Sequence, residues 1–145
     1  MFHKTLWVII ICNVCLLPLN VYASSIKEDY ELQERCGKRS EEWFKSKYGD
    51  GFSRSDDGNM RSHYKNHYNK KQNKCFILIN NNFVDTNKKN NKDQSFTDKF
   101  LYDVNENGYY GSYMNMVEGS DCIFLEKKCK SEKEWDLLVK PYMEE

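Results

Sequence analysis

The cysteines are the feature that most constrains how this chain can fold. Two of the six lie in the first 23 residues, so the number that can form disulfides depends on whether that segment is cleaved. Met1–Lys4 is short and positively charged, and Leu6–Leu19 is apolar. Val21-Tyr22-Ala23 then supplies the small residue at −1 and the compatible residue at −3 that a signal peptidase requires. Cleavage after this motif removes Cys12 and Cys15 and leaves four of the six cysteines. An even number of cysteines in an exported chain predicts two disulfide bonds.

The four remaining cysteines, Cys36, Cys75, Cys122 and Cys129, admit three pairings. We favour Cys36–Cys75 and Cys122–Cys129, because the first pair would join a helix to the start of a buried strand. On the chain-entropy model, loops of about 40 and about 8 residues are worth about 4 and about 2.5 kcal/mol. A zinc site or a redox pair is the alternative. However, no C-x-x-C motif remains after cleavage, and the C-x6-C spacing of the second pair matches no standard zinc site.

A retained membrane anchor and a lipoprotein are the alternatives for the N-terminus. An anchor needs about 20 apolar residues, whereas this run is shorter and contains Asn13 and Pro18. A lipoprotein needs small residues before a cysteine at the end of the apolar stretch, and Cys15 lies inside that stretch. We therefore expect a cleaved signal peptide, residues 1–23, and a periplasmic or secreted protein with no membrane span after cleavage.

The charge balance and the lack of familiar motifs limit the function classes. Lys4 leaves with the signal peptide, so 21 of the 22 basic residues remain against 22 acidic residues. That slight acidic excess argues against a nucleic-acid binder. The sequence has no P-loop, no dinucleotide fingerprint and no G-x-S-x-G elbow, so we expect no cofactor, no metal and no catalytic residue. Abundant Asn and Lys, without an N-x-Ser/Thr acceptor, favour a bacterial protein.

Capping signals predict a helix at each end of residues 24–145. Ser25 and Glu28 form a capping box at the start of a helix over 26–48, which Gly49 would end. The apolar side chains on one side of that helix are Leu32, Cys36, Trp43 and Phe44. A second capping box of Ser131 and Glu134 begins a C-terminal helix, with Trp135, Leu138, Val139 and Tyr142 at helical spacing. Pro141 would end or distort that helix near Lys140.

Strand patterns fill the space between the two helices. Residues 75–79 are continuously apolar, and 105–108 (Asn-Glu-Asn-Gly) is typical of a tight hairpin turn. The expected strands are 75–79, 96–104, 109–116 and 121–126, with a polar hairpin loop over 85–95. The sequence thus predicts one α+β domain, residues 24–145. It has an N-terminal helix, an antiparallel β-meander of about four strands and a C-terminal helix packed on one sheet face, with two disulfides. Such a sheet needs one face covered, and the two helices supply that cover.

Residues 61–74 carry the only clearly basic run of the chain. A solvated surface is the ordinary explanation of such a run. Charge-assisted hydrogen bonds would let it bind a phosphate, an anionic lipid headgroup, an acidic wall polymer or a protein partner. The candidate residues for anion or partner binding are Arg61, His63, Lys65, His67, Lys70, Lys71 and Lys74.

The spacing of His63 and His67 raises a second possibility. Four residues apart, they would share one face of a helix, as metal-binding histidines do, and the repeated HY pair suggests a turn or short helix. No H-E-x-x-H motif is present, and no carboxylate falls between Gly58 and Val84. Ordinary polar packing is therefore the favoured explanation, and a small metal-dependent hydrolase using this region is the alternative function.

Tyrosines gather on the hairpin around Gly108. Tyr109, Tyr110 and Tyr113 form a candidate aromatic contact surface that would stack on sugars or pack against a protein. Strand alternation implies that about half of these tyrosines lie in the core instead.

Three segments resemble small exported bacterial proteins of uncharacterised function. They are 34–39 with 42–44 (ERCGKR and EWF), 67–76 (HYNKKQNKCF) and 134–143. The second contains an H-Y-N-x-K-x-x-K-C-F core. The resemblance implies a bacterial, exported, cysteine-bearing domain, and it carries no activity and no catalytic residue.

These observations favour a non-enzymatic binding module. The expected partner is another envelope or secreted protein, or an anionic component of the envelope. A purely structural envelope protein is a third option.

Overall fold

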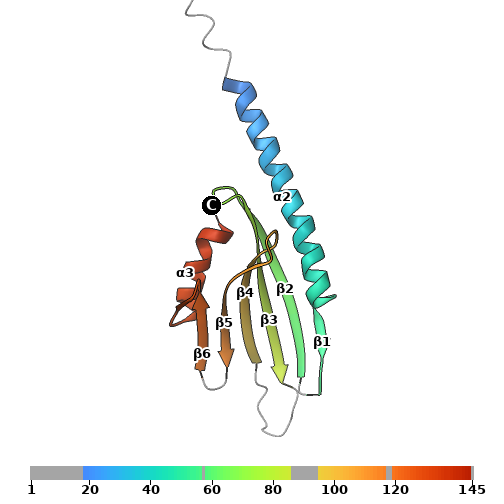
Figure 1. The fold of residues 1–145 in the computed structure, drawn as a ribbon. Coiled ribbons are helices and arrows are strands. Elements are labelled where there is room, and N and C mark those ends of the chain that lie inside the picture. The colour runs from blue at the N-terminus through green and yellow to red at the C-terminus, as the bar shows by residue number, and fades with distance from the viewer. Residues whose placement is uncertain (1–17, 57, 86–94, 117–118, 145) are drawn as a thin grey trace, which may run out of the picture. The chain divides into compact units, whose positions relative to one another are not determined.

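The computed structural model describes residues 18–56, 58–85, 95–116 and 119–144, which form two helices and seven strands (Figure 1). In chain order these are α2 (Pro18–Tyr48), β1 (Phe52–Arg54), β2 (Gly58–Asn69), β3 (Lys74–Asp85), β4 (Ser95–Asp103), β5 (Gly108–Met116), β6 (Gly119–Phe124), β7 (Lys127–Lys128) and α3 (Glu132–Met143). Residues up to Leu32 and residues from Gln33 onward form two separate units. No helix in the described ranges is both long and apolar enough to cross a membrane.

Helix α2 begins earlier than the capping box of Ser25 and Glu28 predicts. Its first described residue is Pro18, which the first turn of a helix accepts because the N–H groups there have no intrahelical acceptor. Signal cleavage after Ala23 would therefore fall inside this helix, and it stays a prediction. The expected apolar core of the signal lies outside the described residues except for its last positions. The helix ends as expected, with Gly49 in a left-handed conformation of φ 61° and its N–H bonded to the Lys45 carbonyl.

The seven strands form one antiparallel meander in the order β1 to β7. The expectation of about four strands is wrong, because the sequence pattern did not show β1, β2 and β7. Strands β1 and β7 have only 3 and 2 residues. Strand β2 has 12 residues but consists almost entirely of polar and tyrosine side chains, which a search for apolar alternation passes over. The expected hairpin loop between β3 and β4 falls at 86–94, outside the described residues.

Helix α3 and the part of α2 from Gln33 onward cover opposite faces of the sheet, whereas the sequence suggested that both helices would cover one. Phe44 of α2 packs with Ile77 and Ile79 in one core cluster. Trp135 of α3 packs with Phe76 in another. Consecutive residues of a strand point to opposite faces, so the apolar side chains of 75–79 point alternately into the core under α2 and the core under α3. A continuous apolar run is what a strand buried on both faces requires.

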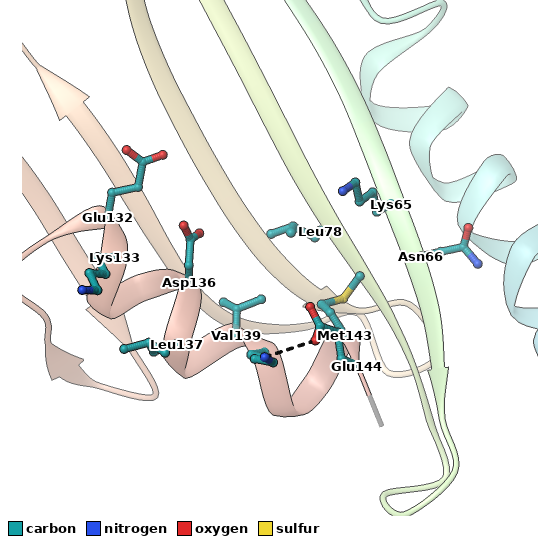
Figure 2. A pocket seen from close by; sticks show the side chains of 11 residues that line it. Lys65, Asn66, Leu78, Glu132, Lys133, Asp136, Leu137, Val139, Met143 and Glu144 are labelled. Atoms are coloured by element: carbon teal, nitrogen blue, oxygen red, sulfur yellow. Dashed lines mark ion pairs between the residues drawn. The ribbon is translucent and has the colours of Figure 1, made fainter.

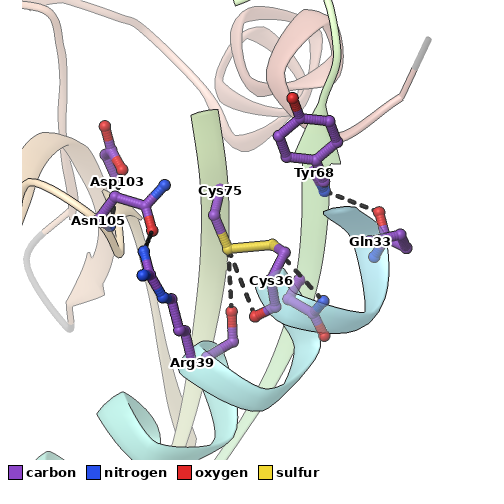
Figure 3. The surroundings of a disulfide bond; sticks show 9 residues. Gln33, Cys36, Arg39, Tyr68, Cys75, Asp103 and Asn105 are labelled. Atoms are coloured by element: carbon purple, nitrogen blue, oxygen red, sulfur yellow. Dashed lines mark hydrogen bonds between the residues drawn. A yellow bond between two sulfur atoms is a disulfide. The ribbon is translucent and has the colours of Figure 1, made fainter. Parts of the chain in front are cut away.

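The predicted cysteine pairs are both at disulfide distance. The Cα atoms are 5.4 Å apart for Cys36 and Cys75 and 5.0 Å apart for Cys122 and Cys129. The first pair joins α2 to the start of β3 (Figure 3). Ser40, fully buried one turn further along α2, places its Oγ 3.5 Å from the Cys75 Sγ. The second pair closes the hairpin between β6 and β7.

Helix α3 confirms the second capping box but not the predicted break. The Ser131 side chain accepts a hydrogen bond of 3.2 Å from the Glu134 N–H. The helix continues through Pro141 to Met143. A proline is tolerated there because its missing N–H would have bonded the carbonyl of Leu137, an exposed residue that water can reach. The Pro141 carbonyl itself accepts a hydrogen bond from Asn69 on β2.

We expect Gly111→Ala to lower the free energy of unfolding by about 2 kcal/mol, as overpacking of a tight core does. A Cβ at this β5 position would collide with the Ile123 carbonyl and lie 3.0 Å from the Trp135 ring. Urea denaturation measures the loss. Gly37→Ala in α2 is the matched control, because its Cβ would meet only the Asn66 amide at 3.8 Å. An equal loss in both variants would contradict the close packing of β6 and α3 around Gly111.

Candidate binding surfaces of the sheet

More than half of the basic run predicted from sequence lies on β2, where every second side chain points to the same face of the sheet. Arg61, His63 and Lys65 are exposed and point to the face that carries α3. Tyr64, between them, points to the opposite face and packs against Phe44 of α2. Arg61, His63 and Lys65 therefore form a single row of basic side chains on one face of the sheet.

Neighbouring strands widen this row into a surface. By strand register, Arg61 lies between Phe52 of β1 and Asn82 of β3, and His63 lies beside Asn80. The guanidinium groups of Arg61 and Arg54 each lie 5.8 Å from the centre of the Phe52 ring, so two cations share one aromatic ring. We call this surface the basic face. It consists of Arg54, Arg61, His63, Lys65, Asn80 and Asn82.

Three basic residues of the basic face have no carboxylate partner in the described structure. In the part of the chain that the structure describes, Arg61, His63 and Lys65 form no ion pair with an Asp or Glu. The amides of Asn80 and Asn82 add hydrogen-bond donors beside them. Cations with adjacent amide donors are suited to hold phosphate, sulfate or carboxylate groups.

Lys74 belongs to the same basic run but is engaged elsewhere. Its Nζ lies 2.8 Å from the Asp103 carboxylate and 2.6 Å from that of Glu106. The hydrogen bonds that its ammonium donates to Asp103 and Glu106 hold the pKa of Lys74 well above its usual value. Because Asp103 is fully buried, this ammonium serves as its counter-charge.

Lys70 and Lys71 lie in the turn between β2 and β3. Both side chains are exposed, and each is already engaged in an interaction. The structure thus separates the seven predicted residues. Three form the row on β2, His67 is half-buried on the same strand, two lie in the turn, and Lys74 pairs with a buried carboxylate.

The histidines do not meet as the helical spacing suggested. His63 and His67 lie on β2, so the prediction of a turn or short helix is wrong. Four residues of strand separate their backbones by about 13 Å, against about 6 Å on a helix. The Nε2 of His67 is buried without a hydrogen-bond partner in the described structure. Within the described ranges, no three His, Cys, Asp or Glu side chains gather as metal ligands do.

The tyrosine hairpin presents one exposed ring. Tyr109 is 52 % exposed, and its hydroxyl lies 2.7 Å from Ser112 Oγ. Tyr110 is held edge-on between Phe76 and Tyr142. Tyr113 is buried in the core beneath α3. The structure therefore places these three rings in three different environments, and only the first offers an accessible face.

A groove of about 720 Å³ runs between α3 and the strands β2 and β3 (Figure 2). Leu78, Val139 and Met143 supply its apolar lining, and Lys65 of the basic face stands at its β2 side. Its acidic lining residues, Glu132, Asp136 and Glu144, lie on α3 or directly after it.

Lys99 from β4 ties the sheet to α3 at this groove. Its Nζ lies 2.8 Å from Glu132 and 2.9 Å from Asp136. Burial acts to lower the pKa of Lys99, but the hydrogen bonds to these carboxylates outweigh it and raise that pKa above its usual value. These two acids thus form ion pairs with Lys99, and neither forms one with Lys65 in the described structure.

Sequence reasoning missed Arg54, Asn80 and Asn82 as parts of the basic face. Their signal is the register of β1, β2 and β3, which a short run of polar residues does not reveal. Comparison with family models, curated proteins and solved structures finds no match for this chain. Its function is therefore inferred from its own residues.

Proposed function

We propose that this protein is an exported, non-enzymatic binding module that holds an anionic partner on its basic face. The observation that carries the proposal is the row of Arg61, His63 and Lys65, exposed along one strand and unpaired with any described carboxylate. Cations that only keep a protein in solution are usually interspersed with acids. A row of basic side chains without acids between them, beside amide donors, favours binding of an anionic partner instead.

The chemistry of the row fits a partner with repeated negative groups. Side chains two residues apart on a strand project about 6.6 Å from one another on the same face. Arginine grips an anion through a planar fork, whereas lysine acts as a point charge. An anionic envelope polymer or headgroup, or an acidic surface of an envelope protein, would engage several of these cations together.

Export is part of the proposal. Two cysteine pairs at disulfide distance suit an oxidising compartment, and the N-terminal pattern is that of a signal peptide. A hydrolase that uses His63 and His67 has less support, because β2 separates the two imidazoles. An interface built on the tyrosine hairpin has only Tyr109 to offer as an exposed ring.

We expect Arg61→Ala/Lys65→Ala to weaken binding of linear polyphosphate at least tenfold and to lower its dependence on salt. Fewer cations release fewer counterions, so the slope of log K against log salt should fall by about 2. Fluorescence titration of the disulfide-intact protein across a salt series measures both quantities.

The matched control is Lys127→Ala/Lys128→Ala, which removes the same charge from exposed positions on β7. It should bind within about twofold of the unaltered protein. If both double variants lose affinity equally, the attraction is non-specific. If the unaltered protein binds without salt dependence, the anionic partner is excluded.

A further inference from the structure

The face of the sheet that carries the second half of α2 also bears a second apolar surface, separate from the core beneath the helix. Met60, Phe83 and Phe96 lie side by side in register on β2, β3 and β4, and Met116 ends β5 beside them. None of these four belongs to either core cluster of the described structure. The Phe83 and Phe96 ring centres are 6.0 Å apart. Together the four side chains line a hollow of about 810 Å³.

One carboxylate, that of Asp98, lines this hollow. Asp98 follows Phe96 by two residues on β4 and therefore shares its face. Its register neighbours are Asn81 and Met114. Within the described ranges it has no hydrogen-bond or ion-pair partner, and burial raises its pKa above the usual aspartate value. The titratable groups of neighbouring elements on this face are Tyr48, bonded to Asn81, and Asp121 on β6, beside Met114.

The half-buried Asp98 differs from the fully buried carboxylate of its strand. Asp103, at the other end of β4, has Lys74 as its counter-charge. Asp98 is partly withdrawn from water and has no described cation beside it. An unpaired charge in such a place costs folding free energy, and groups of this kind concentrate at functional sites. A ligand with a positive charge would remove that cost.

We propose that this hollow binds a small organic cation, with a positively charged nitrogen beside Asp98 and its apolar portion against Phe83 and Phe96. Ring faces attract cations through their quadrupole, and methionine adapts its shape to irregular apolar ligands. The volume lies within the range of small-molecule pockets, about 300–1,000 Å³. Met60 and Arg61 are consecutive on β2 and point to opposite faces, so this site is independent of the basic face.

The test uses benzyltrimethylammonium as the cation, with benzyl alcohol and benzenesulfonate as the neutral and anionic comparisons. Carbon-13 spectra of the methionine methyl groups report directly on Met60 and Met116, which line the hollow. We expect saturable shifts of both signals with a millimolar dissociation constant, as suits a ligand of this size. The cation should bind at least tenfold more tightly than either comparison. Shifts that do not saturate, or equal affinity for all three probes, would overturn the proposal.

Three substitutions separate recognition of the charge from non-specific apolar binding. Asp98→Asn should reduce the preference for the cation over benzyl alcohol to less than twofold. Asp56→Asn, which removes an exposed carboxylate outside the hollow, should leave it unchanged. Met116→Lys places a cation at a position that is already 52 % exposed, and it should abolish probe binding without unfolding the chain. Retained cation preference in Asp98→Asn would contradict the proposal.

Stability provides an independent readout. Because burial raises the pKa of Asp98, folding favours its protonated form. Asp98→Asn should therefore raise the midpoint of thermal unfolding at pH 7. The gain should shrink as the pH falls through the pKa of this carboxyl, where the cation also loses affinity. A lower midpoint at pH 7 would show that Asp98 has a partner within the chain, and the cation site would be excluded.

Discussion

Replacing Cys36 and Cys75 together by alanine is expected to lower the free energy of unfolding by about 4 kcal/mol, a larger loss than we expect from any other substitution in this protein. The two residues are 39 positions apart, so the bond removes much of the freedom of the unfolded chain. Both side chains are also buried, at 2 % and 1 % exposure, between α2 and the strands. Equilibrium urea denaturation measures the loss, and the m-value should rise because the unfolded chain exposes more surface without the bond.

The companion variant Cys122→Ala/Cys129→Ala tests the origin of that effect. Its loop spans 7 positions, so the chain-entropy model assigns a smaller loss of about 2.5 kcal/mol. The order of the two variants is the critical outcome. If the hairpin pair proves more costly than the pair that joins α2 to β3, loop length does not govern the stabilisation and packing around the sulfur atoms does.

Three features of the fold could be predicted because each depends on local chemistry. The pairing of the cysteines followed from a core-facing helix position and the start of an apolar strand. The turn before Gly108 followed from Asn107, which adopts the left-handed conformation with φ 52°. The cap of α3 followed from the spacing of Ser131 and Glu134. The turn and the cap involve only neighbours in the sequence, and the pairing over 39 positions followed from the local setting of each cysteine.

The number of strands and the cover of the sheet could not be predicted in the same way. β2 is held by its pairing with β3 over the whole of Gly58–Asn69, and that partner is what makes a polar sequence a strand. The assignment of α2 and α3 to opposite faces was partly visible in the continuous apolar run at 75–79. That run shows that both faces of the strand are covered. It does not show which helix covers which face, because this depends on how far each helix extends along the sheet.

The candidate sites likewise have parts that local sequence predicts and parts that depend on strand pairing. The charges in the sequence were enough to locate the row on β2. The other residues of the basic face, Arg54, Asn80 and Asn82, follow only from the strand register. Charge alone also placed Lys74 in the binding run, although its partner Asp103 is 29 positions away. The hollow around Asp98 left no pattern in the sequence, because its lining residues come from five strands and meet only after folding.

Lys74→Met is expected to lower the free energy of unfolding by about 3 kcal/mol, because it leaves the Asp103 carboxylate buried without a counter-charge. Asp103 is 0 % exposed, whereas the lysine side chain is 26 % exposed, which places the loss at the lower end for a broken buried pair. The raised pKa of Lys74 keeps it charged throughout pH 5–9. Its contribution is present below the unfolded-state pKa and is lost only as pH rises through the higher folded-state value. The penalty should therefore be as large at pH 9 as at pH 7 in urea denaturation.

The double variant Lys74→Met/Asp103→Asn distinguishes an orphaned charge from lost packing. An asparagine at 103 keeps an oxygen for the Asn105 N–H, which now bonds the carboxylate at 2.9 Å, and needs no cation. It should recover more than half of the loss, as removal of both members of a buried pair often does. Lys45→Met, at an exposed α2 position paired with Glu41, is the control and should leave the urea midpoint nearly unchanged. No recovery in the double variant would mean that the contact of Lys74 with the Tyr110 ring, rather than its charge, stabilises this end of the sheet.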